Sequence, residues 1–248
     1  MIAWRTGTLV ETKMASEHVM SLTFEVPDWP GHEAGQHCDI LLVAPNGYRA
    51  ERSYSIATAP ARPEDGPEVG TKVEFGVVLL PDGEVSPYLW KMQPGQQLNL
   101  RGPIGRHFTW DHTLPGPLVL IGGGSGMVPL VSMLRHYVNH RQESAHEVIV
   151  IESGRTQARL LYRDELDEYA KQFPEIKIIR PLTDQVPPNW SGLTGRVNAT
   201  MLEASLASTS KTVANIYVCG ATSFVELVAD TLVTIGFNTT RIKTERFG

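Results

Sequence analysis

The sequence predicts a two-domain protein, with an antiparallel β-barrel over residues 1–112 and an α/β domain with a parallel sheet over residues 113–248. Three observations predict this. A chain of 248 residues is long enough for two separate cores. Up to about residue 108 the hydrophobic pattern is that of short strands, whereas apolar runs then alternate with longer helical stretches. A linker-like run, Asp111–Pro117, separates the two patterns.

In the first half, runs rich in Val or Thr are bounded by Pro, Gly and Asp, as strands of an antiparallel barrel are. The predicted strands include Met20–Val26, Cys38–Val43 and Val73–Leu80. Residues 31–37 are expected to form a turn that enters the second of these strands. The segment Pro60–Gly70, rich in proline and acidic residues, is expected to be an exposed loop.

In the second half, short apolar runs predict the buried strands of a parallel sheet, and segments with apolar residues at helical spacing predict the helices between them. The strands are expected at Leu118–Ile121, Glu147–Ile151, Lys177–Ile179, Ile216–Cys219 and Thr240–Lys243. The helices are expected after the first strand to about His140, then at Leu160–Phe173 and Phe224–Ile235.

Composition excludes several classes of function. A net charge of −5 argues against general nucleic-acid binding, which needs a basic face. No apolar run approaches the 18 residues of a membrane span, and the first residues lack the pattern of a secretory leader, so we expect a cytoplasmic protein. Two cysteines, Cys38 and Cys219, are too few for the four thiolates of an iron–sulfur cluster.

A glycine-rich turn follows the strand Leu118–Ile121 and opens a helix. Its residues are Gly122, Gly123, Gly124, Ser125 and Gly126. Glycines allow the backbone to approach a pyrophosphate, and a helix N-terminus offers free N–H groups to it. The turn departs from the G-x-G-x-x-G pattern, since Met127 holds the sixth position. It therefore predicts a dinucleotide site, with a plain strand-to-helix connection as the alternative.

A polar run in the barrel, Arg52-Ser53-Tyr54-Ser55, lies at the end of an expected strand. It supplies a guanidinium, an aromatic face and hydroxyl groups along an extended segment. These groups suit the diphosphate, the ring system and the N5 edge of a flavin. The alternative is an ordinary exposed strand with alternating polar residues.

Six segments, in one order along nearly the whole chain, together resemble the ferredoxin–NADP reductase-like flavoprotein family. The resemblance is nearest to the reductase components that serve bacterial oxygenases. The segments are RSYSIAT (52–58), GEVSPYL (83–89), GPIGRHF (102–108), IGGGSGMVPL (121–130), YVCG (217–220) and TERFG (244–248).

The resemblance implies that the barrel binds FAD through the segments RSYSIAT and GEVSPYL. Arg52, with Ser53 beside it, would bind the diphosphate, Tyr54 would stack on the isoalloxazine, and Ser55 would bond near N5. Gly83, Val85 and Ser86 match a turn that opens a capping helix facing the diphosphate. For Ser86 a plain helix N-cap is the other interpretation, and the two roles are compatible.

In the second domain the resemblance implies that Gly122–Gly126 cradle the dinucleotide pyrophosphate, and that Cys219 and Gly220 border the nicotinamide. Glu245 matches a tail carboxylate near the reacting rings. Buried packing for Cys219 and a solvated side chain for Glu245 are the alternatives, and Cys38 is expected in the core. Many relatives end in a tyrosine that covers the flavin, whereas Phe247 is the nearest aromatic residue here.

The choice between NADP and NAD depends on the residues near the end of the second strand of this domain. Arg155, Arg163 and Arg196 are at positions where NADP-using relatives place cations. Glu152 argues for NAD, because a carboxylate would accept from a free ribose 2′-hydroxyl and repel a phosphate. We expect NADPH as the donor, with NADH open. The alternative is that Arg159 and Arg163 pair with Asp164 and with acids such as Glu168 on a solvated helix face.

The predicted function is transfer of hydride from NADPH, or NADH, to FAD, followed by delivery of electrons to a separate partner. Because this chain cannot hold a cluster, the partner would be a small ferredoxin, a Rieske-type protein or an oxygenase. Three alternatives stay open: a stand-alone flavin or quinone reductase, a non-catalytic FAD-binding electron-transfer subunit, and a flavin-free nucleotide-binding module. The sequence also leaves FMN open as the flavin.

Overall fold

The structure is a computed structural model that describes residues 2–62, 65–66, 71–143 and 146–247. Part of the predicted loop Pro60–Gly70 lies outside these residues. The chain divides into two compact units. The first comprises residues 1–111 and 131–138, and the second comprises residues 112–130 and 139–248.

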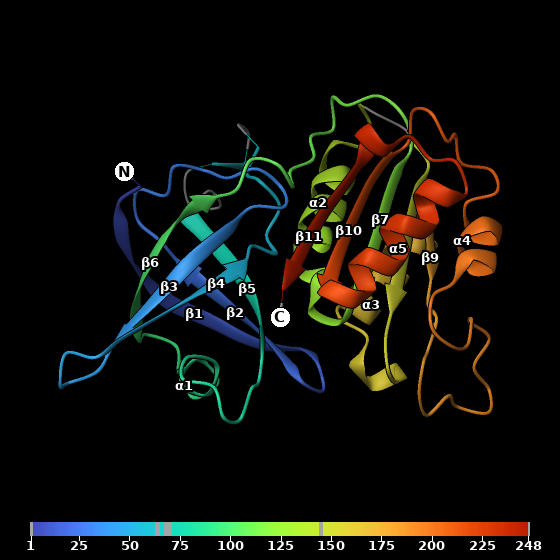
Figure 1. The fold of residues 1–248 in the computed structure, drawn as a ribbon. Helices are drawn as coiled ribbons and strands as arrows, with labels where there is room; N and C mark the ends of the chain where they lie inside the picture. The colour runs from blue at the N-terminus through green and yellow to red at the C-terminus, as the bar shows by residue number, and fades with distance from the viewer. Residues whose placement is uncertain (1, 63–64, 67–70, 144–145, 248) are drawn as a thin grey trace. The chain divides into compact units, whose positions relative to one another are not determined.

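The first unit contains a six-stranded antiparallel sheet, as predicted. Its strands pair in the order β4-β3-β6-β1-β2-β5. An antiparallel bridge between Ile56 and Phe75 joins the two edges, β4 and β5, so the sheet closes into a barrel (Figure 1). The elements are β1 (Trp4–Ser16), β2 (Val19–Glu25), β3 (His37–Val43), β4 (Arg49–Ser55), β5 (Lys72–Val78), α1 (Ser86–Leu89) and β6 (Gln97–Ile104).

Side chains that point into the barrel alternate along a strand with side chains that point out of it. Val73, Phe75 and Val77 of β5 are fully buried, while the residues between them are partly exposed. Phe24 of β2 packs near Phe75, with ring centroids 6.0 Å apart. Cys38 lies in the same core with no exposed surface, which confirms its predicted place.

The second unit contains a five-stranded parallel sheet in the order β11-β10-β7-β8-β9. Helices connect the strands, as the alternating pattern predicts. The elements are β7 (Leu118–Gly123), α2 (Met127–His140), β8 (Val148–Ser153), α3 (Arg163–Gln172), β9 (Ile176–Ile179), α4 (Ala199–Ser205), β10 (Asn215–Ala221), α5 (Thr222–Thr234) and β11 (Ile242–Phe247). Residues 131–138 of α2 belong to the first unit. Single 3₁₀ turns occupy Gly124–Gly126, Gln157–Arg159 and Thr239–Arg241.

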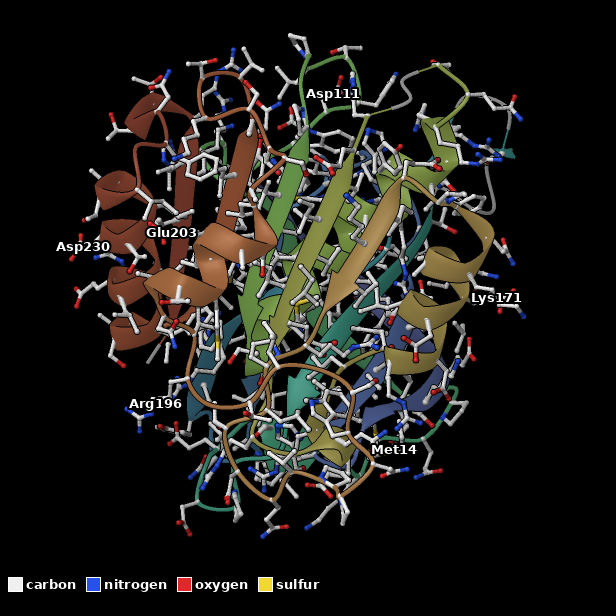
Figure 2. The ribbon with its side chains drawn as sticks, turned by 90° about the vertical axis from the view of Figure 1, so that its right-hand side faces the viewer. Met14, Asp111, Lys171, Arg196, Glu203 and Asp230 are labelled. Atoms are coloured by element: carbon white, nitrogen blue, oxygen red, sulfur yellow. The ribbon has the colours of Figure 1, made fainter. Side chains whose placement is uncertain are left out.

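The strand order reverses next to β7. From β7 the chain adds β8 and β9 on one side, then crosses to add β10 and β11 on the other. In such sheets, ligands bind outside the carboxyl ends of the strands at the reversal, here between β7 and β10. On one face, α4 and α5 cover alternate buried residues of β7, β8 and β10; α4 carries Glu203 in front of the strands in Figure 2.

Two elements of this unit begin at least two residues later than predicted. The helix predicted from Leu160 begins at Arg163, because Leu161 gives its N–H to Glu152 and Tyr162 takes a left-handed conformation. The last strand begins at Ile242 and not at Thr240, because Asn238 caps a 3₁₀ turn over Thr239–Arg241. No helix within the described residues has both the length and the apolarity needed to cross a bilayer.

Candidate functional site

The glycine-rich turn lies where the sequence predicts, between the end of β7 and the start of α2. Gly124 has φ +56°, which favours glycine, and a Cβ there would meet nothing within 4 Å, so its surroundings are open. Gly126 is the opposite case. A Cβ at Gly126 would come within 2.1 Å of the carbonyl oxygen of Cys219.

The register places several of the predicted residues in one row across the sheet. Gly122 of β7 pairs with Cys219 of β10, and Cys219 pairs with Glu245 of β11. On the other side, Gly122 pairs with Glu152 of β8. Gly220 packs back to back with Gly123, since a Cβ on Gly220 would lie 3.4 Å from the Gly123 nitrogen. The structure therefore gathers residues from four strands at the reversal point.

Cys219 is fully buried in this row. Burial raises the pKa of its thiol well above the usual value, and the negative charge of Glu245 raises it further. The thiol is therefore protonated at neutral pH and contributes a small apolar side chain. Glu245 is half-buried on β11, the strand that holds the tail.

The tail aromatic residue ends β11. Phe247 pairs with Ala221 in the register and its side chain is exposed. The neighbouring Arg246 lies 3.8 Å from Glu226 of α5. Gly248 lies outside the described residues. The tail is therefore an ordered edge strand of the parallel sheet as far as Phe247.

In the barrel, an ion pair joins two of the predicted motifs. Arg52 of β4 donates from Nη2 to Glu84 at 3.0 Å, and Glu84 belongs to the turn that precedes α1. Tyr48 donates to the other oxygen of Glu84 at 2.5 Å. Arg52 and Glu84 are both exposed. The Arg52–Glu84 pair, which sequence analysis missed, thus brings the guanidinium to the Gly83–Ser86 turn.

The side chains of this turn serve its own structure. Val85 is buried in the barrel core and is the N-cap residue of α1, so the predicted N-cap role of Ser86 is wrong. The hydroxyl of Ser86 is buried and accepts the Leu80 N–H at 3.0 Å. Gly83 donates its N–H to Leu80 at 2.8 Å. Any contact of this turn with a ligand therefore comes mainly from its backbone.

The other three residues of the run Arg52–Ser55 differ in whether their side chains are already engaged in contacts within the barrel. Ser53 donates to Asp39 at 2.6 Å, and Arg101 also bonds Asp39, so the Ser53 hydroxyl belongs to a structural network. Tyr54 is half-buried against the core, and burial raises its pKa to about 12. Ser55 is half-buried, and its hydroxyl takes part in none of the hydrogen bonds found among the described residues.

Two of the three predicted arginines lie on joined segments. Isolated parallel bridges link Gly154 to Leu182 and Leu182 to Thr194. Arg155 directly follows Gly154, and Arg196 lies two residues after Thr194. Arg155 is largely exposed and lies 3.8 Å from Asp184. Arg196 is exposed and lies on the loop that leads to α4, as Figure 2 shows.

Arg163 begins α3 and pairs with Asp164 at 3.0 Å, as the bland interpretation predicts. Its carbonyl accepts from Arg180 at 3.3 Å. Arg180 also bonds Asp167 and, at 3.1 Å, Glu152. This arginine, which sequence analysis missed, links the ends of β8 and β9 to the start of α3.

Glu152 is not the exposed ribose ligand that its place after β8 suggests. It is buried, and it accepts from Leu161 N–H at 2.5 Å and from Arg180 at 3.1 Å. Burial raises its pKa to about 7, although the charge of Arg180 and the hydrogen bonds from Leu161 and Arg180 act in the opposite direction. The interpretation of Glu152 as an argument for NAD was therefore wrong.

The residues present fit both cofactors of the predicted class. An open glycine turn, with Gly126 pressed on Cys219, has the form of a pyrophosphate cradle. An exposed guanidinium, a half-buried phenol ring and an uncommitted hydroxyl on β4 have the chemistry that a flavin requires. The fold and these two sites define a flavin- and nicotinamide-dependent oxidoreductase with one domain for each cofactor.

Comparison with known proteins supports this class and gives its family. Residues 6–110 match the oxidoreductase FAD-binding domain, and residues 120–230 match the oxidoreductase NAD-binding domain. The chain is 34% identical over 227 residues to ferredoxin–NADP reductase B of Sorangium cellulosum, covering 90% of this chain and 88% of the relative. It belongs to the ferredoxin–NADP reductase-like family and binds FAD and a nicotinamide dinucleotide.

Solved structures share the fold. The FAD/NAD-binding domain of nitric oxide dioxygenase from Vibrio cholerae matches with a TM-score of 0.81 at 22% identity, covering 98% of each chain. A ferredoxin NADP⁺ reductase from Neisseria gonorrhoeae with bound FAD and NADP matches with a TM-score of 0.79 at 22% identity, again covering 98% of each chain. Identities this low show the fold alone.

Proposed function

We propose that this protein takes hydride from NADPH onto FAD and passes the electrons on to a separate ferredoxin or Rieske-type oxygenase partner. Membership of the family already establishes that the protein is an oxidoreductase that transfers electrons from a pyridine nucleotide. The proposal adds the donor, the acceptor and the roles of individual residues. The predicted boundary at residues 112/113 and the cytoplasmic location stay predictions beside it.

The observation that carries the proposal is the packing of the glycine turn against Cys219 and Gly220 at the strand reversal. This is where an open parallel sheet binds a dinucleotide. We infer that backbone N–H groups of the turn Gly122–Gly126, with Ser125 among them, bind the pyrophosphate. Cys219 and Gly220 then border the nicotinamide, where small side chains allow close approach of the reacting ring.

NADPH is the proposed donor because the acid at the end of β8, Glu152, is buried and bonded to Arg180, whereas exposed arginines lie near it. Arg155, Arg196 and Arg163 are available in or next to exposed segments, whereas Glu152 is buried and bonded to Arg180. A guanidinium fork suits a 2′-phosphate, and a buried carboxylate cannot reach a ribose hydroxyl. The Sorangium cellulosum relative is a ferredoxin–NADP reductase, which agrees with this donor.

The barrel side chains have complementary roles in the proposal. When bound, FAD accepts hydride and releases electrons singly, and the protein supplies position and electrostatics. Arg52 binds the diphosphate, Tyr54 stacks on the ring system and Ser55 donates a hydrogen bond near N5. The Gly83–Ser86 turn contributes its backbone, and Ser53 supports β4 through Asp39. Glu245 and Phe247 are proposed to lie at the edge of the reacting rings.

The test is an anaerobic titration of the purified yellow protein with NADPH and, separately, with NADH, following flavin absorbance. We expect bleaching by both, at a lower concentration of NADPH. A yellow protein that neither nucleotide bleaches would indicate a non-catalytic subunit, and a colourless one a flavin-free module; both outcomes reject the proposal. The acceptor is tested by comparing steady-state reduction of a ferredoxin or Rieske protein with that of free flavin and quinones. Turnover confined to the small acceptors would reject a protein partner.

A further inference from the structure

An exposed tyrosine directly precedes β4 in the barrel and lies outside the motifs assigned to the flavin. Tyr48 is 55% exposed, and its hydroxyl donates to Oε1 of Glu84 at 2.5 Å. Oε2 of the same carboxylate accepts from Nη2 of Arg52 at 3.0 Å. A single acid of the turn before α1 therefore holds the phenol and the guanidinium at one place on the barrel.

Tyr48 continues the row of side chains that is proposed to contact the flavin. Its carbonyl accepts from the Ala44 N–H at 2.8 Å, so the antiparallel pairing of β4 with β3 extends to this residue. Alternate residues of a strand point to one face, and Tyr48 therefore shares a face with Arg52 and Tyr54. Ser53 points to the opposite face, where its hydroxyl is engaged in the hydrogen-bond network described above.

The order of side chains along this row matches the order of the groups in FAD, which has the isoalloxazine at one end, adenosine at the other end and the diphosphate between them. Tyr54 is proposed for the ring system and Arg52 for the diphosphate. Beyond Arg52 in the same direction, Ala50 is buried, so Tyr48 is the next exposed side chain. At 3.4 Å per residue its Cα lies about 14 Å along the strand from that of Arg52, and its bond to Glu84 brings the ring back towards the guanidinium.

We propose that Tyr48 forms the adenosine end of the FAD site, with its ring stacked on the adenine base, and so makes this barrel select FAD over FMN. Arg52 binds the diphosphate in this arrangement, so the inference rests on the proposed function. An exposed aromatic ring stacks on a nucleotide base, and the hydroxyl bond to Glu84 holds the ring, so little side-chain freedom is lost on binding. The hydrogen bond and the negative charge of Glu84 also raise the pKa of Tyr48, so the phenol remains a protonated donor at neutral pH.

The test measures the dissociation constants of FAD and of FMN by equilibrium dialysis of the full chain after removal of its flavin. FMN has the same ring system and a phosphate but no adenosine, so the ratio of the two constants isolates the adenosine end. Tyr48→Leu is expected to weaken FAD binding about tenfold and to leave FMN binding unchanged, because stacking on one base contributes on this scale. Tyr48→Phe keeps the ring and should bind FAD more tightly than Tyr48→Leu.

Tyr88→Leu is the matched control, because Tyr88 is a similarly exposed tyrosine that lies on α1 and not in the row. It should leave both constants unchanged, and far-UV circular dichroism establishes that each variant is folded. Unchanged FAD binding in Tyr48→Leu would overturn the proposal. Equal weakening of FAD and FMN in that variant, or the same selective loss in Tyr88→Leu, would overturn it as well, because the effect would then not come from adenine at Tyr48.

Arg52→Ala separates this inference from the proposed function, because loss of a phosphate ligand weakens the binding of both flavins. If Arg52→Ala weakens both and Tyr48→Leu weakens neither, the role of Arg52 stands and the adenosine site at Tyr48 is rejected. If Arg52→Ala weakens neither, the diphosphate assignment is rejected, and the adenosine site that rests on it is rejected too.

Discussion

Gly126 is pressed against the carbonyl oxygen of Cys219, so closely that a Cβ at Gly126 would stand 2.1 Å from that oxygen. The contact joins the start of α2 to the end of β10 across the strand reversal. Both sides of the reversal carry residues that the proposal assigns to the dinucleotide. A change at Gly126 therefore affects both the turn that is proposed to bind the pyrophosphate and the residues that are proposed to border the nicotinamide.

Gly126→Ala is expected to weaken binding of NADP⁺ at least tenfold and to lower the free energy of unfolding by about 1–3 kcal/mol. The added methyl group must displace backbone on one side, and overpacking costs about this much. Isothermal titration with NADP⁺ and urea unfolding measure the two effects. Flavin content should stay close to one per chain, because the barrel is unchanged.

Gly236→Ala is the control for a glycine with positive φ in the same unit. Gly236 has φ +93°, and the nearest atom to an added Cβ is 3.9 Å away, so only backbone strain is introduced. We expect lower stability but an unchanged affinity for NADP⁺. Equal losses of affinity in Gly126→Ala and Gly236→Ala would show that stability, and not the contact with Cys219, limits nucleotide binding.

The Arg52–Glu84 ion pair makes opposite predictions for its two partners. Arg52→Ala should weaken FAD binding by tenfold or more, because a charge-assisted contact with the diphosphate is lost. Glu84→Gln should keep or strengthen FAD binding, because the amide no longer competes with the diphosphate for the guanidinium. Equilibrium dialysis of apoprotein against FAD gives both constants. If Glu84→Gln weakened FAD binding as much as Arg52→Ala, the pair would be structural and Arg52 would not be the diphosphate ligand.

Ser55→Ala is expected to slow flavin reduction about 10- to 100-fold with little change in the dissociation constant for NADPH. The hydroxyl is proposed to bond near the reacting edge of the flavin, and one positioned donor contributes on this scale. Anaerobic stopped-flow absorbance separates the limiting rate from the dissociation constant. Ser53→Ala is the comparison, since the Ser53 hydroxyl bonds Asp39. An unchanged limiting rate in Ser55→Ala would remove its assigned role.

Periodicity predicted both folds and the place of the glycine turn, because these depend on patterns within a few residues. The predicted ends of helices and strands were wrong where the local structure depends on a hydrogen bond to a residue outside the element. Leu161 gives its N–H to Glu152, nine residues earlier, and so delays α3 to Arg163. The apolar spacing of Leu202 and Leu206, with Asn198 as a cap, was the signal that would have predicted α4.

The site shows the same division. Motifs placed Arg52, Cys219 and Glu245, and the register confirms that Cys219 and Glu245 are neighbours. Contacts between residues distant in the sequence could not be predicted. The hydrogen bond of Arg180 to Glu152, for example, joins residues that are 28 positions apart in the chain. One signal was available, since Glu84 stands inside the recognised motif GEVSPYL.

Arg155→Ala should raise the KM for NADPH about tenfold and leave the KM for NADH nearly unchanged. The exposed guanidinium is proposed to pair with the 2′-phosphate, which NADH lacks. Steady-state kinetics with both donors give the ratio of kcat/KM values. Lys171→Ala, an exposed cation on α3, controls for net charge and should leave that ratio alone. Equal losses for the two donors in Arg155→Ala would defeat the phosphate assignment.

Glu152 makes the stability of the protein depend on pH in a direction opposite to that of most paired carboxylates. Its pKa is raised by burial from 4.5 to about 7, so the folded state holds a proton that the unfolded state releases. The stabilisation from this group is fully present below pH 4.5 and is lost as pH rises through 7. Relative to Glu152→Gln, wild-type protein should therefore lose up to about 3 kcal/mol of unfolding free energy between pH 5 and pH 8.

Urea unfolding of wild-type protein and Glu152→Gln at pH 5, 6, 7 and 8 measures this difference, with Glu226→Gln as the control. Glu226 is an exposed acid of α5, so the difference between that variant and wild type should stay constant across the range. Parallel stability curves for Glu152→Gln and wild type would mean that Arg180 fully offsets the cost of burying the charge. Glu152 would then be ionised throughout, and the Glu152–Arg180 contact would hold the start of α3 as a permanent ion pair.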